Sequence, residues 1–419
     1  MDALRIKGGA TLEGPIDVSG SKNASLPIIA ATLLADGESI LRAVPDLADI
    51  NTFCRLIAQM GGEIGLSRDA LRIDASGIDR REAPYEMVRT MRASILVLGP
   101  LLARFGSARV SLPGGCAIGA RPIDQHLKGF ARLGAEITLE HGYVVARADR
   151  LVGAEVNFDM PTVGGTENLM LAASLAKGTT VLHNVAREPE IVDLAKVLNL
   201  MGAEIHGAGS QRITIHGQDS LQPFDHRVVA DRIEFGTFLV AGAIAGNGLV
   251  VRGGIPDHQA ALIDKLREVG ARIEIDRDDQ SVTIHRAESP KPVNVTTAPY
   301  PGFPTDMQAQ LMTCLTVADG TSVISENIFE NRFMHVAELR RLGANIRVDG
   351  GKAVVRGVAG LSGTTVMATD LRASASLVLA GLIADGETIV RRIYHLDRGY
   401  ERIGHKLGSV GAQIERFSE

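Results

Sequence analysis

A short pattern recurs six times along the 419 residues of this chain. It consists of a large apolar residue, a glycine, a glycine or alanine, one variable residue and an isoleucine. The first glycines of the six copies are Gly61, Gly134, Gly202, Gly270, Gly343 and Gly411. Each of the first three lies 209 positions before its counterpart among the last three. The chain is therefore a set of three repeats that has been duplicated, and this periodicity constrains the fold before any chemistry is considered.

Each repeat combines two kinds of helix with short strands. The glycine of the pattern follows an amphipathic segment of about three turns and suits a left-handed helix cap, and the residues after it predict a strand. A second helix, rich in alanine and leucine and nearly free of charge, precedes the first and should be buried on all sides. These buried helices are predicted at residues 24–35, 94–103, 167–176, 235–245, 307–318 and 373–384. We therefore predict an α/β fold with helices inside and sheets outside.

Composition excludes several classes of protein. The net charge of −5 argues against binding to bulk nucleic acid, and the absence of tryptophan leaves few platforms for stacking on bases. The longest apolar stretches, residues 93–103 and 374–384, are shorter than the roughly 20 residues that a membrane span needs. The first residues lack the apolar core of a signal peptide, and the three cysteines are too far apart to suggest a disulfide framework or a zinc site. We expect a cytoplasmic, globular protein.

Charged residues at predicted helix starts break a general rule. Acids are favoured there because a helix N-terminus is partially positive. The half-exposed helices are predicted to start about a turn after a charged residue, which is an acid in three cases (Asp49, Glu190, Asp257) and arginine in three (Arg121, Arg332, Arg398). The buried helices begin near Lys22, Arg92 and Arg372. Each cation could pair with a nearby acid on the surface, but together they favour a basic cleft for a small ligand with several negative groups.

Two further stretches carry candidate catalytic residues. Residues 111–122 contain three glycines and two prolines and predict a loop, in which Cys116 lies five residues before Arg121. A nearby cation favours the reactive thiolate, although a free cysteine is commonly buried and inert, as we expect for Cys54 and Cys314. Residues 297–306 contain three prolines and end at Asp306, which either caps the next helix or presents its carboxylate to the cleft.

Eight stretches spread in order over nearly the whole chain carry a specific resemblance. They are residues 19–24, 90–94, 112–122, 187–193, 303–308, 329–335, 368–374 and 397–401. In them the chain resembles the UDP-N-acetylglucosamine 1-carboxyvinyltransferases, a family of enolpyruvyl transferases of bacterial cell-wall synthesis. The resemblance implies two inside-out α/β barrels, each of three βαβαββ repeats. It implies one domain at residues 22–229, which carries the Cys116 loop as a lid, and a second at 230–419, which the segment 1–21 completes.

The resemblance also implies a reaction. The enolpyruvyl group of phosphoenolpyruvate is transferred to the 3-hydroxyl of UDP-N-acetylglucosamine with release of phosphate, by addition and elimination through a tetrahedral intermediate. This is the first committed step of peptidoglycan synthesis, in the cytoplasm, and it needs a base, an acid and cations for the donor. No cofactor, metal, nucleic acid or membrane is implied. The residues do not indicate an oligomeric state.

Site residues follow by similarity. Asp306 is placed at the sugar hydroxyl, Cys116 is the acid that also forms a covalent adduct with the donor and reacts with fosfomycin, and Lys22 is the third catalytic residue. The residues implied to bind phosphoenolpyruvate are Lys22, Asn23, Arg121, Arg332, Arg372 and Arg398. Those implied to bind UDP-N-acetylglucosamine are Arg92, Arg121, Pro122, Ile123, Asp124, Gln125, Thr162, Val163, Gly164, Asp306 and Ile328.

Some residues depart from the family pattern, and three other functions compete. Ala48 and Met160 stand where relatives carry lysines, and Thr162 stands where serine is common, which affects the contacts expected with the diphosphate. A 5-enolpyruvylshikimate-3-phosphate synthase would lack the Gly-Gly-Cys loop. An RNA 3′-phosphate cyclase would need a histidine in a comparable loop, whereas the nearest, His126, is predicted on a helix. A non-catalytic nucleotide-sugar-binding paralogue would be expected to have lost Cys116, Asp306 or Lys22.

Overall fold

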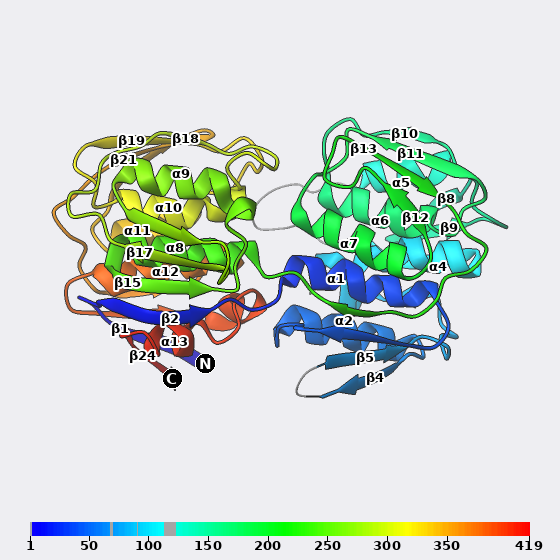
Figure 1. Cartoon of the computed structure of the whole chain (residues 1–419), viewed down its shortest axis with the longest axis horizontal. Helices are drawn as coiled ribbons and strands as arrows, with labels where there is room; N and C mark the ends of the chain where they lie inside the picture. Colours follow the sequence, from blue (N-terminus) through cyan, green and yellow to red (C-terminus); the bar gives the residue numbers. More distant parts are fainter. Residues whose placement is uncertain (1, 68–69, 90, 113–122) are drawn as a thin grey trace. The chain divides into compact units, whose positions relative to one another are not determined.

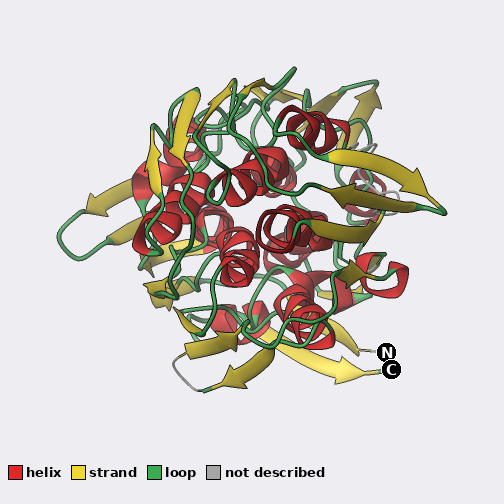
Figure 2. Ribbon diagram, turned by 90° about the vertical axis from the view of Figure 1, so that its right-hand side faces the viewer, coloured by secondary structure: helices red, strands yellow, loops and turns green. Residues whose placement is uncertain are grey.

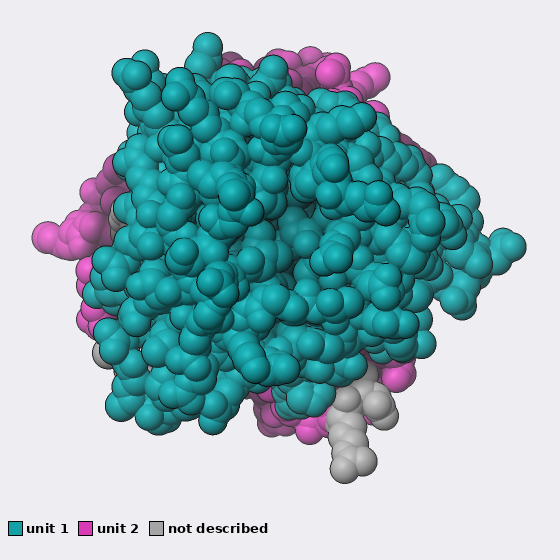
Figure 3. Space-filling model, turned by 90° about the vertical axis from the view of Figure 1, so that its left-hand side faces the viewer, with its two compact units in different colours: residues 1–19, 116–120, 230–419 teal, residues 20–115, 121–229 magenta. Residues whose placement is uncertain are grey.

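The structure is a computed structural model that describes residues 2–67, 70–89, 91–112 and 123–419. The predicted site residues Cys116, Arg121 and Pro122 therefore lie outside the described residues. The described chain divides into two compact units (Figure 1). Unit 1 comprises residues 2–19 and 230–419, and unit 2 comprises the described residues from 20 to 229. In Figure 3, residues 2–19 and 230–419 carry one colour because they belong to the same unit.

The described residues form six sheets of four strands, three in each unit, and all six obey one rule. The first two strands in spatial order are parallel, and the remaining neighbours are antiparallel. In unit 2, the first sheet has the strand order β14 (Asp225–Arg227), β3 (Glu38–Arg42), β5 (Ala70–Asp74) and β4 (Glu63–Leu66). The second has the order β6 (Glu82–Ala83), β7 (Ser107–Ser111), β9 (Tyr143–Arg147) and β8 (Glu136–Glu140). The third has the order β10 (Glu155–Asn157), β11 (Thr179–His183), β13 (Arg212–His216) and β12 (Glu204–His206).

Unit 1 repeats this rule with strands from both ends of the chain. Its first sheet has the strand order β2 (Leu12–Asp17), β15 (Gly246–Arg252), β17 (Ser281–His285) and β16 (Arg272–Asp276). The second has the order β18 (Val295–Thr296), β19 (Thr321–Ser325), β21 (Lys352–Arg356) and β20 (Asn345–Asp349). The third has the order β22 (Thr365–Met367), β23 (Glu387–Arg391), β1 (Asp2–Lys7) and β24 (Gln413–Ser418). In five sheets the last two strands form a hairpin. In the sixth, β1 and β24 take that place, and Asp2 lies opposite Ser418.

All six helices predicted to be buried are present and buried. They are α1 (Lys22–Ala31) with the 3-10 turn η1 (Thr32–Leu34), η2 (Arg92–Val97) with α4 (Leu98–Phe105), α6 (Val163–Ala173), α8 (Arg232–Ala245), η4 (Thr305–Met307) with α10 (Gln308–Leu315), and α12 (Leu371–Ile383). In Figure 2, helices lie toward the middle of the view and strands toward its rim. The apolar composition of these helices therefore predicted their place correctly.

The partly exposed helices are also present. They are α2 (Ala48–Gln59), α5 (Asp124–Arg132), α7 (Pro189–Leu200), η3 (Pro256–Gln259) with α9 (Ala260–Val269), α11 (Val336–Arg341) and α13 (Ile403–Gly408). Each ends one to three residues before a glycine of the six-fold pattern, and all six glycines have a positive φ between 91° and 112°, as the left-handed cap predicts. Two further short elements are α3 (Tyr85–Val88) and η5 (Ile393–Arg398). No helix in the described part of the chain is long and apolar enough to cross a membrane.

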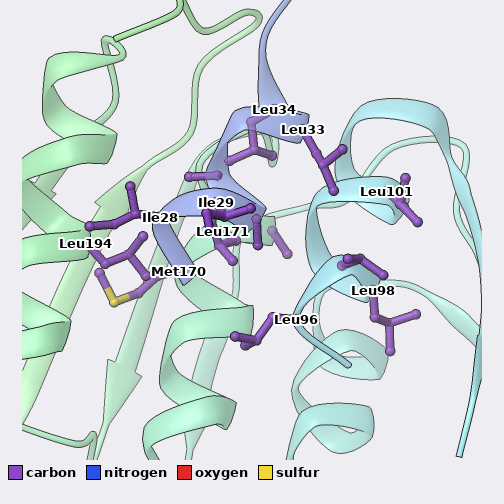
Figure 4. Packing of buried hydrophobic residues seen from close by; sticks show 14 of the residues in the cluster. Ile28, Ile29, Leu33, Leu34, Leu96, Leu98, Leu101, Met170, Leu171 and Leu194 are labelled. Atoms are coloured by element: carbon purple, nitrogen blue, oxygen red, sulfur yellow. The ribbon is translucent and has the colours of Figure 1, made fainter. Parts of the chain in front are cut away.

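Each unit has its own hydrophobic core. In unit 2, Ile28 and Ile29 of α1 lie against Met170 and Leu171 of α6 and against Leu194 of α7 (Figure 4). A fully buried side chain of this size contributes about 1.5–3 kcal/mol by leaving water. Packing between buried helices thus holds the helix starts in place, and those starts carry the charged residues of the candidate site.

Candidate functional site

The carboxylate of Asp306 is clamped by two buried arginines in unit 1. Arg332 Nη2 donates to Asp306 Oδ1 at 2.7 Å, and Arg372 Nε donates to Asp306 Oδ2 at 3.2 Å. Arg332 is 5% exposed and Arg372 2%, whereas the Asp306 side chain is 26% exposed. Burial alone would raise the pKa of Asp306, but Arg332, Arg372 and Arg232 together lower it well below its ordinary value. The carboxylate is therefore ionised and reaches the surface, while the two cations beside it are held inside.

The structure corrects the expectation that Asp306 caps the helix that follows it. The residue lies within η4, whose N-cap is Pro304 without a side-chain cap, so Asp306 does not cap the helix. The sharper alternative, a carboxylate presented to charged partners, fits the observed contacts. The expectation that cations pair with acids on the surface is also wrong here, because the pairs of Arg332 and Arg372 with Asp306 involve buried guanidinium groups.

Arg372 keeps unused hydrogen-bond donors inside the protein. Its Nη1 and Nη2 atoms are buried and make no well-formed hydrogen bond with the described residues, although the Tyr400 hydroxyl lies near enough to raise the pKa of Arg372, while its Nε is engaged by Asp306. A guanidinium has five N–H groups in a planar fork that matches carboxylate and phosphate oxygens. Buried donors normally find partners, and leaving them unpaired costs free energy. Arg372 is therefore suited to receive an anionic ligand next to the Asp306 carboxylate.

Glu326 organises the backbone around Asp306, and no sequence pattern indicated this role. The Glu326 carboxylate is buried and accepts from Thr305 Oγ1 at 2.9 Å, from Thr297 Oγ1 at 2.9 Å and from the backbone N–H of Ile328 at 2.8 Å. It thereby joins both ends of the proline-rich segment 297–306 to the loop that carries Ile328. No repeat or motif identified this residue, because its role depends on Thr297 and Thr305, which lie more than 20 residues before it in the chain.

Arg232 is a second missed residue, and the duplication could have revealed it. Arg232 opens α8 as Lys22 opens α1, and the two lie 210 positions apart, close to the repeat offset of 209. Its guanidinium carbon is 5.7 Å from the centre of the Tyr300 ring. Its charge contributes to lowering the pKa of Asp306. The cations at the starts of buried helices therefore include Arg232 as well as Lys22, Arg92 and Arg372.

Lys22 in unit 2 is also part of a buried ion pair. Its Nζ lies 2.8 Å from Asp49 Oδ2, and both side chains are buried. Asp49 belongs to the first turn of α2, and Glu190 belongs to the first turn of α7. The expectation that a charged residue precedes each partly exposed helix by about a turn is therefore wrong for these two acids. Asp49 pairs with Lys22 from the first turn of α2. The sequence patterns had assigned these two residues to separate helix starts.

Arg332 and Arg398 do not form anion sites together with a long helix, as their place before a predicted helix start had indicated. Their helices, α11 and α13, have six residues each, too short for a substantial helix dipole. The immediate partner of Arg332 is the Asp306 carboxylate. Arg398 is the last residue of η5 and is half-buried two positions before Tyr400. Asn23, the remaining donor-binding candidate, is half-buried in the first turn of α1.

The candidate nucleotide-sugar residues of unit 2 lie at the starts of three helices. Thr162 caps α6 and accepts from the N–H of Gly165 at 3.3 Å, so that Val163 and Gly164 form the first turn. Arg92 opens η2, and Ile123 and Asp124 begin α5. Gln125 Oε1 accepts from the N–H of Asp159 at 2.7 Å, which ties α5 to the segment before Thr162. A hollow of about 670 Å³ is lined by Gln125 and by neighbouring residues of α5 and β10, but it includes no other candidate.

The two described cysteines are chemically inert. Cys54 and Cys314 are buried in α2 and α10. Burial raises the pKa of Cys54 to about 11 and that of Cys314 to about 12, so neither forms a thiolate near neutral pH. Cys116, the predicted reactive cysteine, lies outside the described residues.

The fold agrees with what comparison with known proteins finds. The EPSP synthase (3-phosphoshikimate 1-carboxyvinyltransferase) family matches residues 6–407, and the chain belongs to this family of enolpyruvyl transferases. A UDP-N-acetylglucosamine 1-carboxyvinyltransferase from Geotalea daltonii is 58% identical over 419 residues and covers both chains completely. The protein of the same name from Myxococcus xanthus is 58% identical over 422 residues and covers 99% of each chain.

Solved structures give the same fold. The enolpyruvyl transferase NikO from Streptomyces tendae superposes with a TM-score of 0.89 at 29% identity and covers 100% of this chain and 99% of its own. An EPSP synthase from Acinetobacter baumannii superposes with a TM-score of 0.76 at 20% identity over the whole of both chains, which shows the fold alone. The predicted enolpyruvyl transferase fold, a mixed α/β fold with six four-stranded sheets, is confirmed.

Proposed function

We propose that this chain transfers the enolpyruvyl group of phosphoenolpyruvate to the 3-hydroxyl of UDP-N-acetylglucosamine and releases phosphate. Its 58% identical relatives are named as 1-carboxyvinyltransferases of UDP-N-acetylglucosamine, which supports this proposal. The observation that carries the proposal is the Asp306 carboxylate between two buried arginines, one of which has unpaired N–H donors. Such a site offers cations to an anionic donor and a carboxylate to a hydroxyl at the same place. The reaction belongs to peptidoglycan synthesis and takes place in the cytoplasm.

The chemistry divides into two steps. In the addition, the sugar oxygen bonds to C2 of phosphoenolpyruvate, its proton leaves to a base, and the methylene carbon receives a proton from an acid. In the elimination, the new methyl group loses a proton, the C2–O bond to phosphate breaks and inorganic phosphate departs. We assign Asp306 to the sugar hydroxyl and Cys116 to the acid that also forms the covalent adduct. Lys22, Asn23, Arg121, Arg332, Arg372 and Arg398 are assigned to the donor.

The clamp on Asp306 bears on its role as a base. A carboxylate whose pKa lies well below its ordinary value accepts a proton poorly. When the anionic donor binds beside Arg332 and Arg372, its negative charge offsets part of the positive charge that faces Asp306, and the pKa of Asp306 rises. The base is therefore strengthened when the donor is bound. This order suits an enzyme that must not deprotonate the acceptor before the donor arrives.

The acceptor and the domain organisation complete the proposal. Arg92, Arg121, Pro122, Ile123, Asp124, Gln125, Thr162, Val163, Gly164 and Ile328 are assigned to UDP-N-acetylglucosamine together with Asp306. The two units are assigned as inside-out barrels of three βαβαββ repeats, at residues 22–229 and at 230–419 with residues 1–21. Buried helices ringed by three sheets in each unit support this assignment.

The decisive experiment measures phosphate release from phosphoenolpyruvate with two acceptors. We expect release with UDP-N-acetylglucosamine and none above background with shikimate 3-phosphate. The second acceptor is the proper competitor because the matching family is described by that reaction. Release with shikimate 3-phosphate alone would assign the chain to the other branch of the family. Release with neither acceptor would support a protein that binds nucleotide sugars without catalysis.

A further inference from the structure

A buried hydroxyl network lies directly behind the Asp306–Arg372 pair in unit 1. Tyr400 Oη is 3.0 Å from Thr237 Oγ1 and 3.1 Å from Gln310 Nε2, and Gln310 Nε2 is also 3.3 Å from Thr237 Oγ1. Thr237 and Gln310 are fully buried, and Tyr400 is almost fully buried. The guanidinium carbon of Arg372 lies 5.4 Å from the centre of the Tyr400 ring, within the range of a cation–π contact.

The direction of each hydrogen bond follows from the donors available. The hydroxyl of Thr237 donates its only hydrogen to the carbonyl of Ile233 at 2.8 Å, so its oxygen can only accept from Tyr400 and Gln310. Tyr400 must then donate to Thr237 and accept from Gln310. Burial raises the pKa of Tyr400 although Arg372 opposes it, so the phenol keeps the hydrogen that this arrangement requires. The network thus has a single consistent orientation.

The network joins the elements that carry the site. Thr237 lies on α8, which begins at Arg232, and Gln310 lies on α10, which follows Asp306 directly. Tyr400 lies two residues after Arg398, and its ring packs against Arg372 near the start of α12. If the Tyr400 ring shifted, the Arg372 guanidinium that packs against it would shift relative to the Asp306 carboxylate. Small displacements of this kind can cost a large factor in catalysis.

We propose that Tyr400 is a positioning residue for the donor-binding site: held by Thr237 and Gln310, it fixes the Arg372 guanidinium in the orientation in which Nε engages Asp306 and the remaining N–H groups can be offered to the anionic donor. Tyr400 touches neither reacting atom and acts through Arg372. The expected change in the KM for phosphoenolpyruvate rests on the proposed function, whereas the expected loosening of the Arg372 side chain does not. The positioning role predicts an effect on phosphoenolpyruvate that does not extend to the acceptor.

The kinetic test uses Tyr400→Phe, which keeps the ring and removes the hydroxyl. We expect the KM for phosphoenolpyruvate to rise about tenfold, the size expected for the loss of one buried hydrogen bond, with the KM for UDP-N-acetylglucosamine within about twofold of wild type. Thr237→Val should reproduce this change, and Thr237→Ser should recover most of it. The matched control is Thr313→Val, since Thr313 Oγ1 donates to the Ser376 carbonyl at 3.1 Å in the same helical core without touching Tyr400. This control should lower thermal stability and leave both KM values unchanged.

A second measurement does not depend on activity. The Nε–H of Arg372 is identified by ¹⁵N NMR as the arginine signal that disappears in Arg372→Lys. Because this group is buried and bonded to Asp306, it should resist hydrogen exchange in wild type and exchange at least about tenfold faster in Tyr400→Phe. Unchanged exchange in Tyr400→Phe overturns the inference, as does a KM change shared equally by Thr313→Val. If wild type releases no phosphate but exchange rises as expected, the proposed function fails while the positioning role stands.

Discussion

Replacing Asp306 by asparagine should destabilise the protein as well as inactivate it. Asparagine has nearly the same shape but no charge, so the substitution removes the counter-charge of Arg332 and Arg372 while the surrounding packing stays the same. Removing one partner of a buried ion pair costs about 3–5 kcal/mol, because the remaining charge stays inside without compensation. Two buried guanidiniums lose their partner here, and Arg232 adds a third positive charge nearby.

The partial exposure of Asp306 lowers this figure. Its side chain is 26% exposed, so water can replace part of the lost interaction, and we expect about 3 kcal/mol. For a unit of roughly 150–250 residues, each kcal/mol shifts the melting temperature by about 2–4 °C, which gives a fall of about 6–12 °C. The matched control is Asp257→Asn, which breaks a 2.9 Å pair with Arg277 whose side chains are both 67% exposed, and should shift the melting temperature by no more than about 2 °C.

Differential scanning calorimetry in a phosphate-free buffer at pH 7.5 measures both variants. Adding inorganic phosphate should then stabilise Asp306→Asn more than wild type, because the anion can take the place of the missing carboxylate between the arginines. A melting temperature of Asp306→Asn equal to or above that of wild type would refute the argument. It would mean that the two arginines are not buried cations held by this carboxylate.

The remaining predictions concern reactivity and acid stability. Cys116→Ala should lower turnover by about a hundredfold or more, with aspartate at this position restoring part of it as an alternative acid, and full activity of the alanine variant would contradict the assignment. Fosfomycin should label Cys116 alone in peptide mass spectrometry, because burial raises the pKa of Cys54 to about 11 and of Cys314 to about 12; a label on either would be inconsistent with this. Burial and the charge of Arg92 lower the pKa of His126 from 6.5 to about 4, so the unfolded chain binds a proton that the folded chain refuses. Stability should therefore fall by about 2 kcal/mol as the pH drops from 6.5 to 5, and urea unfolding of His126→Gln should show a clearly smaller fall than wild type.

Much of the fold could be predicted because periodicity and composition both report it. The six glycines placed the six helix-to-strand turns, and the charge-free helices were correctly expected to be buried. The order of strands could not be predicted. That β1 lies between β23 and β24 depends on pairing between residues 380 or more positions apart, and hydrophobic patterns in single segments contain no such information.

The site was predicted less completely than the fold. The cations at helix starts were found because they break a local rule, and the structure brings Arg332 and Arg372 to Asp306. The pairing of Lys22 with Asp49 could not be predicted, because each residue was explained by its own helix. Glu326 and Tyr400 act only through partners from distant segments, so their roles become visible only when the chain is folded.

The place of β1 and β2 has a consequence for how the chain is made. Residues 20–229 supply all three sheets of unit 2 and can complete them as soon as they leave the ribosome. The strand β1 has to wait until residues 413–418 are synthesised, because β24 is one of its two neighbours. At about 5–20 residues per second this delay is roughly 20–80 s. During that time Leu4 and Ile6 of β1, both buried in the finished protein, lack this neighbour, whereas Leu12 and Ile16 of β2 can pair as soon as β15 is made. The strand β1 is therefore among the last to find its place and depends longest on protection from aggregation.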